Sequence, residues 1–258
     1  MEINDVFGIQ PVSDAIKETT VKLFHGLETF LSLVFKPGLE EVGYMLKDKV
    51  RLWRLNNIFS VLNKAKDRLE FDGKDLQIKA NPRVGLAIIE ESSMVDDSEL
   101  QEMWAGLFAS SCSEDGKDDS NIIFVDLLKR ISMVEARILK YACEKSKKKQ
   151  FSNGLIISDS LIIALEELKK ITNIDDIYRL DRELDHLSSL NLISGGPFGS
   201  GGGFYASDSS LNAEITPSAL ALNLYYKTNS IGISPAVFWK ESLSIVDNPE
   251  EEIGKILD

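Results

Sequence analysis

Apolar residues recur at helical spacing along most of this chain, and two stretches show the pattern most clearly. Residues 50–69 and 98–112 each gather apolar side chains on one face, and each carries one tryptophan, Trp53 or Trp104. In the second stretch the apolar positions follow the i, i+3, i+4, i+7 rule, which is typical of an amphipathic helix. The pattern predicts two amphipathic helices, and we hypothesise that their apolar faces pack together.

The first of these helices also carries polar residues beside its apolar face. Arg51, Arg54 and Asn57 fall next to Trp53, in an arrangement that looks like a specified helical interface. We interpret Arg51, Trp53, Arg54, Asn57 and Trp104 as structural or interface determinants. No catalytic set of residues accompanies them.

Capping residues mark where further helices begin. Asn81 followed by Pro82 predicts an N-cap and a first helical position, opening a helix that runs to about residue 91. The pairs Ser98–Gln101 and Ser132–Glu135 match the capping-box pattern, in which two side chains satisfy backbone N–H groups reciprocally. Each pair therefore predicts a helix start.

The second half of the chain predicts a specific order of elements. From about residue 132 these are helices at 133–145, 159–170 and 175–190, an extended segment at 192–194, a glycine-rich tip at 195–204, an extended segment at 213–216 and a closing helix. This order resembles a winged helix. We expect a mainly α fold, with a helical amino-terminal domain at 1–121, a winged-helix-like domain with a small β-wing at 122–230, and an acidic tail at 231–258.

The chain is acidic, with a formal net charge of −12 and a pI near 4.8. Nonspecific affinity for nucleic acid comes largely from Lys and Arg side chains that release counterions, so this charge argues against nucleic acid as a partner. The helix expected at 175–190 carries five acidic residues in its opening part, against only Arg179 and Arg182. We therefore expect the winged helix to serve protein contacts.

Two groups of basic residues interrupt this acidity. Lys145 and Lys147–Lys149 close the helix at 133–145, where cations favour the helix dipole. We interpret this run as a solvated helix end, with an anion-binding patch as the alternative. The basic residues between Lys36 and Arg68 are mixed with acidic ones, which is typical of an exposed helix with ion pairs.

One apolar stretch raises the question of membrane contact. Residues 21–35 are apolar in bulk, but they include Lys22, His25 and Glu28 and are shorter than the roughly 20 residues that span a bilayer. We expect an interfacial or core helix here. Peripheral contact with the inner membrane is the alternative, because the nearby basic residues complement anionic lipid.

Residues that carry metal, cofactor or nucleophilic chemistry are sparse. Neither His25 nor His186 has a second histidine or a C-x-x-C motif nearby to form a metal site. Cys112 and Cys143 fall in apolar helical contexts, which predicts buried free thiols in a reducing cytosol. The glycine-rich tip matches no phosphate-binding loop. The sequence therefore predicts a non-enzymatic, cytoplasmic protein with no metal or cofactor.

Three blocks in a fixed order carry a resemblance to a known family. They are PGLEEVGYMLKDKVRLWRLNN at 37–57, ELQEMWAGLFASS at 99–111 and FVDLLKRISMVEARIL at 124–139. With the winged-helix-like end, they make most of 37–229 similar to the bacterial Abi-alpha family. The resemblance implies a role in abortive infection, in which a phage-infected cell arrests or dies before new virions emerge. It brings no catalytic motif to transfer.

These observations lead to one expected function and two alternatives. We expect a phage-defence component that acts as sensor or effector through protein contacts, with a protein partner or a second copy of the chain. A membrane-directed effector that inserts residues 21–35 when triggered is the first alternative. A winged-helix transcriptional regulator is the second.

Overall fold

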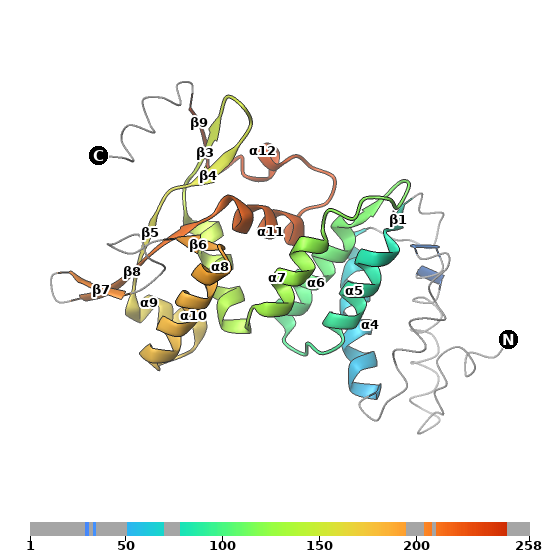
Figure 1. Ribbon diagram of the computed structural model, residues 1–258, viewed down its shortest axis with the longest axis horizontal. Helices are drawn as coiled ribbons and strands as arrows, with labels where there is room; N and C mark the ends of the chain where they lie inside the picture. The colour runs from blue at the N-terminus through green and yellow to red at the C-terminus, as the bar shows by residue number, and fades with distance from the viewer. Residues whose placement is uncertain are drawn as a thin grey trace. The chain divides into compact units, whose positions relative to one another are not determined.

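The computed structural model describes residues 29–30, 33–34, 51–69, 78–194, 204–207 and 210–246. The chain divides into two compact units, unit 1 at Met1–Arg130 and unit 2 at Ile131–Asp258. The described part is mostly helical with small sheets, as expected (Figure 1). The expected domain boundary, after residue 121, lies at the start of a helix that the contacts assign to unit 1.

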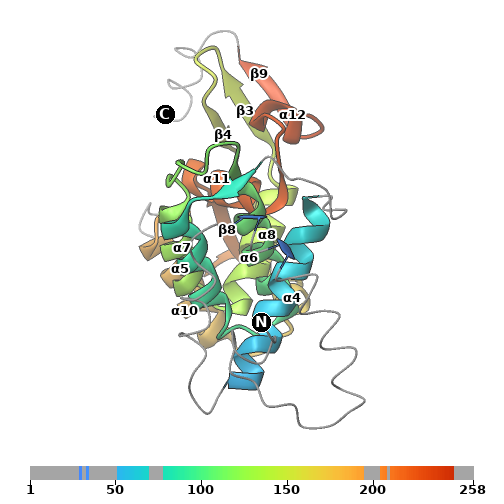
Figure 2. The ribbon, with the colours of Figure 1, turned by 90° about the vertical axis from the view of Figure 1, so that its right-hand side faces the viewer.

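The described residues of unit 1 form helices and one short pair of strands. Its elements are α4 (Arg51–Arg68), α5 (Pro82–Ser92), α6 (Ser98–Ser110), α7 (Ile122–Arg130), β1 (Lys79–Ala80) and β2 (Cys112–Ser113). The two strands pair antiparallel, with Ala80 opposite Cys112. Helix α4 packs along α6, so the hypothesis that the two tryptophan-bearing helices pack together is confirmed (Figure 2).

The core of unit 1 follows the apolar faces read from the sequence. Leu107 and Phe108 of α6 are fully buried, and Val61 and Leu62 of α4 are each 1% exposed. Full burial of such a side chain contributes about 1.5–3 kcal/mol through removal of apolar surface from water. Phe30 is also fully buried, and its ring centroid lies 6.2 Å from that of Phe108.

The caps of unit 1 confirm one prediction and correct another. Asn81 caps α5, with its side-chain oxygen accepting a hydrogen bond from the N–H of Arg83, and Pro82 occupies the first turn as expected. The expected capping box at Ser98 is wrong, because Asp97 is the N-cap of α6 and accepts from two backbone N–H groups. The Gln101 side chain instead donates to the carbonyl of Val95 at 2.9 Å.

In its described part, unit 2 combines helices with two small sheets. Its helices are α8 (Met133–Lys145), α9 (Leu165–Thr172), α10 (Ile177–Ser189), α11 (Ala219–Asn229) and α12 (Pro235–Phe238), and its strands are β3 (Lys148–Phe151), β4 (Ile156–Ser158), β5 (Leu161–Ala164), β6 (Ile193–Ser194), β7 (Phe204–Ser207), β8 (Ser210–Pro217) and β9 (Leu243–Val246). One sheet has the strand order β4-β3-β9 and the other β5-β8-β6, with β7 also paired to β8 (Figure 1).

The helix expected at 159–170 is only partly correct. Residues 161–164 form β5, which pairs antiparallel with β8, and the helix begins at Leu165. The run Leu-Ile-Ile is rich in β-branched residues, which favour strands. Its side chains alternate, with Ile163 buried and Ile162 63% exposed. The extended segment expected at 213–216 is confirmed as part of β8.

Part of the expected acidic tail is folded into unit 2. Residues 235–246 supply α12 and β9, and β9 runs parallel to β3 with Leu243 opposite Lys148. Trp239, which follows α12, is 6% exposed and stacks on Tyr225 with ring centroids 5.6 Å apart. All of the glycine-rich tip expected at 195–204 except Phe204, and the last residues, 247–258, lie outside the described residues.

Candidate functional site

Two of the residues singled out in the sequence join α4 to the end of α5. Arg54 donates from Nε to the Ser93 hydroxyl at 3.0 Å, and Asn57 donates from Nδ2 to the Ser93 carbonyl at 2.9 Å. Arg54, Asn57 and Ser93 are all buried. Ser93 is the C-cap of α5, where carbonyl groups lack partners within the helix, so Asn57 satisfies a carbonyl at the helix end and Arg54 holds the Ser93 side chain.

Further polar contacts fasten α4 to α6 nearer the surface. Glu102 forms ion pairs with Lys64 at 3.0 Å and with Arg68 at 2.8 Å. Burial raises the pKa of Glu102, but hydrogen bonds from Arg68 and Lys64 outweigh it, so the net shift of this pKa is downward. The Ser60 hydroxyl donates to the Gln101 side chain at 2.6 Å. These contacts fix how the apolar faces of α4 and α6 meet.

The two tryptophans occupy different environments. Trp104 is 1% exposed within the core, and its indole Nε1 has no hydrogen-bond partner among the described residues. Trp53 is 38% exposed. The side chain of Arg51 lies outside the described part. The structure thus brings Arg54, Asn57 and Trp104 into the interior of unit 1, and it leaves Trp53 partly open to solvent.

A cluster of polar side chains links α8 to α10 in unit 2. The expected capping box of Ser132 and Glu135 is confirmed at the start of α8. Glu135 is fully buried, and its carboxylate lies 2.5 Å from Nδ1 of His186. The Ser132 hydroxyl donates to Glu183 at 2.8 Å, and Arg179 approaches the same carboxylate at 3.4 Å. We call these residues the α8–α10 cluster.

The electrostatics of the α8–α10 cluster reflect burial. Desolvation raises the pKa of Glu135, and hydrogen bonds from the Ser132 backbone and from His186 only partly oppose it. The contact with Glu135 orients the imidazole of His186. The Ser132 hydroxyl accepts from the N–H of Glu135 as the N-cap of α8, and it donates its own proton to Glu183. Sequence reasoning missed the cluster, because its partners lie on different helices.

A buried lysine closes the carboxyl end of α8. Lys148 is fully buried and donates from Nζ to the carbonyls of Cys143 and Ser146, the second at 2.6 Å. Its Nζ also lies 4.4 Å from the ring centroid of Trp239. Burial lowers the pKa of Lys148. The interpretation of the whole basic run as a solvated helix end is therefore wrong for this residue, which satisfies helix carbonyls from inside.

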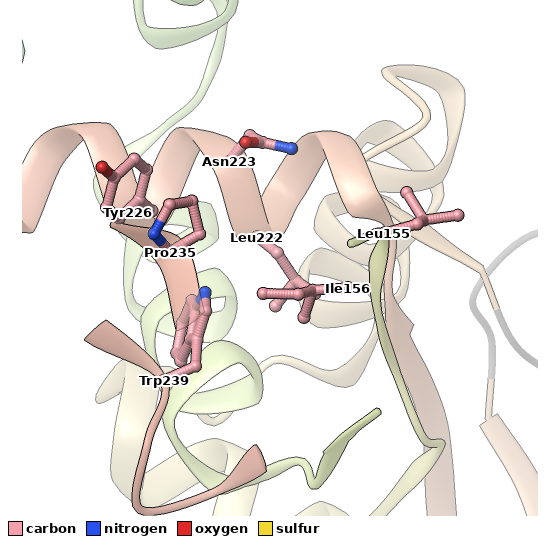
Figure 3. A pocket seen from close by; sticks show the side chains of 7 residues that line it. All are labelled: Leu155, Ile156, Leu222, Asn223, Tyr226, Pro235 and Trp239. Carbon is pink, nitrogen blue, oxygen red and sulfur yellow. The ribbon is translucent and has the colours of Figure 1, made fainter. Parts of the chain in front are cut away.

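Trp239 also lines a small pocket on unit 2 (Figure 3). The pocket has a volume of about 70 Å³. Its lining residues come from the start of β4, from α11 and from the α12 segment, namely Leu155, Ile156, Leu222, Asn223, Tyr226, Pro235 and Trp239. The lining is mostly apolar and carries no ionisable acid or base other than the phenol of Tyr226, whose hydroxyl donates to the carbonyl of Ile233.

Both cysteines are free thiols, as expected, but only Cys143 is buried, whereas Cys112 is half-buried and lies in β2. Burial raises the pKa of Cys112 to about 12 and that of Cys143 to about 12. Since the thiolate is the reactive form, both thiols are poor nucleophiles at neutral pH. The described residues contain no group of three or more His, Cys, Asp or Glu side chains placed to hold a metal ion. Within the described ranges, no helix has the length and apolar character needed to cross a membrane.

Comparison with known proteins identifies one family. The family model named abortive infection alpha matches residues 54–205, a span that begins in α4 and ends in β7. No curated protein and no solved structure matches the chain. The matched span covers more than half of the 258 residues and includes parts of both units. The chain therefore belongs to the abortive infection alpha family.

Proposed function

We propose that this protein is a cytoplasmic component of bacterial defence against phage, and that it acts through protein contacts as a sensor or an effector of abortive infection. The observation that carries the proposal is the family match over residues 54–205. Because the match includes both the α4–α6 packing and the α8–α10 cluster, the role belongs to the two units together.

Non-catalytic action is supported by the structural tasks of the groups that could react. The thiols of Cys112 and Cys143 are held protonated by burial. The amine of Lys148 donates to two carbonyls, and the hydroxyl of Ser132 donates to Glu183. Each of these groups stabilises a helix end or a contact between helices, and the pocket beside Trp239 contains none of them.

We further infer that the part of unit 2 from α8 to α11 is a winged helix. Three helices, α8, α9 and α10, accompany a small antiparallel sheet in the order β5-β8-β6, and β7 pairs with β8 as a wing would. Asp175 and Asp176 come immediately before the third helix, α10, and Asp181, Glu183 and Asp185 lie within it, so phosphate would be repelled from this helix. Contacts with protein are accordingly favoured over contacts with DNA.

The burial of Phe30 and Val34 bears on the alternative of a membrane-directed effector. Phe30 is fully buried beside Phe108, and Val34 is 1% exposed. Both belong to the apolar stretch 21–35, so insertion into a bilayer would require these side chains to leave the protein interior. The protein-contact role needs no such step and is preferred.

A plaque assay tests the proposed role. Cells that express the chain are compared with cells carrying an empty vector, across a panel of phages, and growth after infection at high multiplicity is followed in parallel. We expect fewer plaques with the chain, together with arrest or death of the infected culture. Equal plaque numbers and equal growth across the panel would contradict the defence role.

A further inference from the structure

Three residues on the outward side of α10, Tyr178, Arg182 and Asp185, are exposed, and a fourth, Asp181, is half-buried. Leu180, Leu184 and Leu187 are fully buried and define the inward side of this helix. The α10 outer face lies opposite and consists of Tyr178, Asp181, Arg182 and Asp185, which recur at i, i+3, i+4 and i+7. The contacts of Glu183 with Ser132 and of His186 with Glu135 fix α10 against the start of α8. The outer face is therefore a surface presented by a fixed helix.

The α10 outer face carries two aspartates and one arginine, so its formal charge is negative. Asp181 and Asp185 make no ion pair with any described residue, whereas Arg182 lies 3.5 Å from Glu183 and Arg179 lies 3.4 Å from the same carboxylate. Both arginines thus approach Glu183 and neither pairs with the aspartates, of which Asp185 is exposed and Asp181 is half-buried. Such a face repels phosphate and attracts Lys and Arg side chains.

An exposed aromatic ring lies beside these carboxylates. Tyr178 is 85% exposed, the highest value among the exposed large hydrophobic residues of the described part. Tyrosine is enriched in protein interfaces, where its ring contributes contact area at small cost in conformational entropy. A guanidinium also stacks favourably on such a ring. An aromatic ring flanked by unpaired carboxylates therefore complements an arginine-rich segment.

We propose that the α10 outer face docks an arginine-rich segment of a partner protein. The ring of Tyr178 stacks on a guanidinium, and Asp181 and Asp185 pair with neighbouring cations along the helix. The inference rests on the proposed function in one respect, that the chain works through protein contacts. It adds which surface is used and the chemistry of the partner.

The test measures binding of a fluorescein-labelled octa-arginine peptide to the full chain by fluorescence anisotropy, in about 50 mM salt, where surface charges are little screened. The double variant Asp181→Asn/Asp185→Asn removes the unpaired carboxylates, and Tyr178→Ala removes the ring. The matched control, Glu114→Gln/Asp126→Asn, makes the same change in net charge on exposed residues of unit 1. Thermal unfolding checks that all variants are folded.

We expect the double variant and Tyr178→Ala each to weaken peptide binding by about three- to tenfold, as the loss of exposed ion pairs or of one cation–π contact predicts. The control should bind within about twofold of wild type by the same reasoning. Equal weakening by the control, or unchanged binding by both α10 variants, would overturn the proposal. So would tighter binding of a duplex DNA probe than of the peptide, since that would assign the face to nucleic acid.

A plaque assay with the same variants separates this inference from the proposed function. If wild type protects and the α10 variants protect equally, the docking surface is wrong while the defence role stands. If wild type gives no protection, the defence role fails, and the anisotropy measurement alone decides the docking surface. Loss of protection by the α10 variants, with protection by the control, would support both.

Discussion

The Nζ atom of Lys148 lies 4.4 Å from the ring centroid of Trp239, although the two residues belong to distant parts of the chain. The lysine caps the carbonyls at the end of α8, and the tryptophan follows α12. The contact fixes the segment after α11 onto the carboxyl end of α8, and β9 continues it by pairing with β3. Lys148 thus supplies hydrogen bonds to the end of α8, and Trp239 packs against the lysine. The charge pattern alone would predict that Lys148 is exposed to solvent.

Replacing Lys148 by methionine should destabilise unit 2. The substitution keeps the length of the side chain but leaves the carbonyls of Cys143 and Ser146 without their donor. An unsatisfied buried polar group costs about 1–3 kcal/mol, and we expect the free energy of unfolding to fall by this amount. Urea denaturation measures it. Lys147→Met is the matched control, because Lys147 is exposed, and equal stability of both variants would contradict the capping role.

Replacing Trp104 by alanine should destabilise unit 1 strongly. Trp104 is 1% exposed between packed helices, and truncation of such a core residue costs about 3–5 kcal/mol through lost burial and the cavity left behind. Trp53→Ala, at a site that is 38% exposed, should cost clearly less. Thermal and urea unfolding of the two variants measure the difference. An unchanged unfolding curve for Trp104→Ala would refute the packing of α6 in the core.

The hydrogen bond from Asn57 to the end of α5 can be tested against a neighbouring asparagine that lacks this contact. Asn57→Ala removes the donor to the buried carbonyl of Ser93, so a loss of about 1–3 kcal/mol in the free energy of unfolding is expected. Asn56 is the adjacent residue of the same type and is exposed, so Asn56→Ala is the control. Urea midpoints that shift equally for both variants would show that the hydrogen bond contributes nothing specific.

Local signals in the sequence predicted local structure well. Helical spacing predicted α6 and its buried face, and Asn81-Pro82 predicted the start of α5. The predictions were wrong where the local sequence is compatible with two different structures. Asp97 and Ser98 are both good N-caps, and only the backbone conformation decides between them. A short apolar run such as the one in β5 suits a strand or a helix, and here pairing with β8 decided it.

The chemistry of the candidate site was harder to predict, because its partners are distant in the sequence. Nothing near Lys148 indicates burial, since Trp239 completes its environment from another element. The contact between Glu135 and His186 likewise depends on how α10 packs against α8. The pattern did correctly place polar Arg54 and Asn57 beside an apolar face, yet it could not show that both reach the same residue, Ser93.

The raised pKa of Glu135 determines whether its contribution to stability rises or falls with pH. Desolvation raises this pKa above its ordinary value of 4.5, so the unfolded chain releases the proton at lower pH than the folded one. The contribution of Glu135 to stability is then fully present below about pH 4.5 and is lost as pH rises through the raised pKa. We expect the free energy of unfolding of wild type, minus that of Glu135→Gln, to decrease as pH rises above about 4.5.

Glu102 supplies the opposite case in the same protein. Its pKa is lowered because hydrogen bonds from Arg68 and Lys64 outweigh the effect of burial, so its contribution is present above about pH 4.5 and is lost as pH falls through the lowered pKa. The difference between wild type and Glu102→Gln should therefore increase with pH. Urea denaturation of the three proteins at several pH values measures both slopes. Slopes of the same sign would show that at least one carboxylate is not in the environment described here.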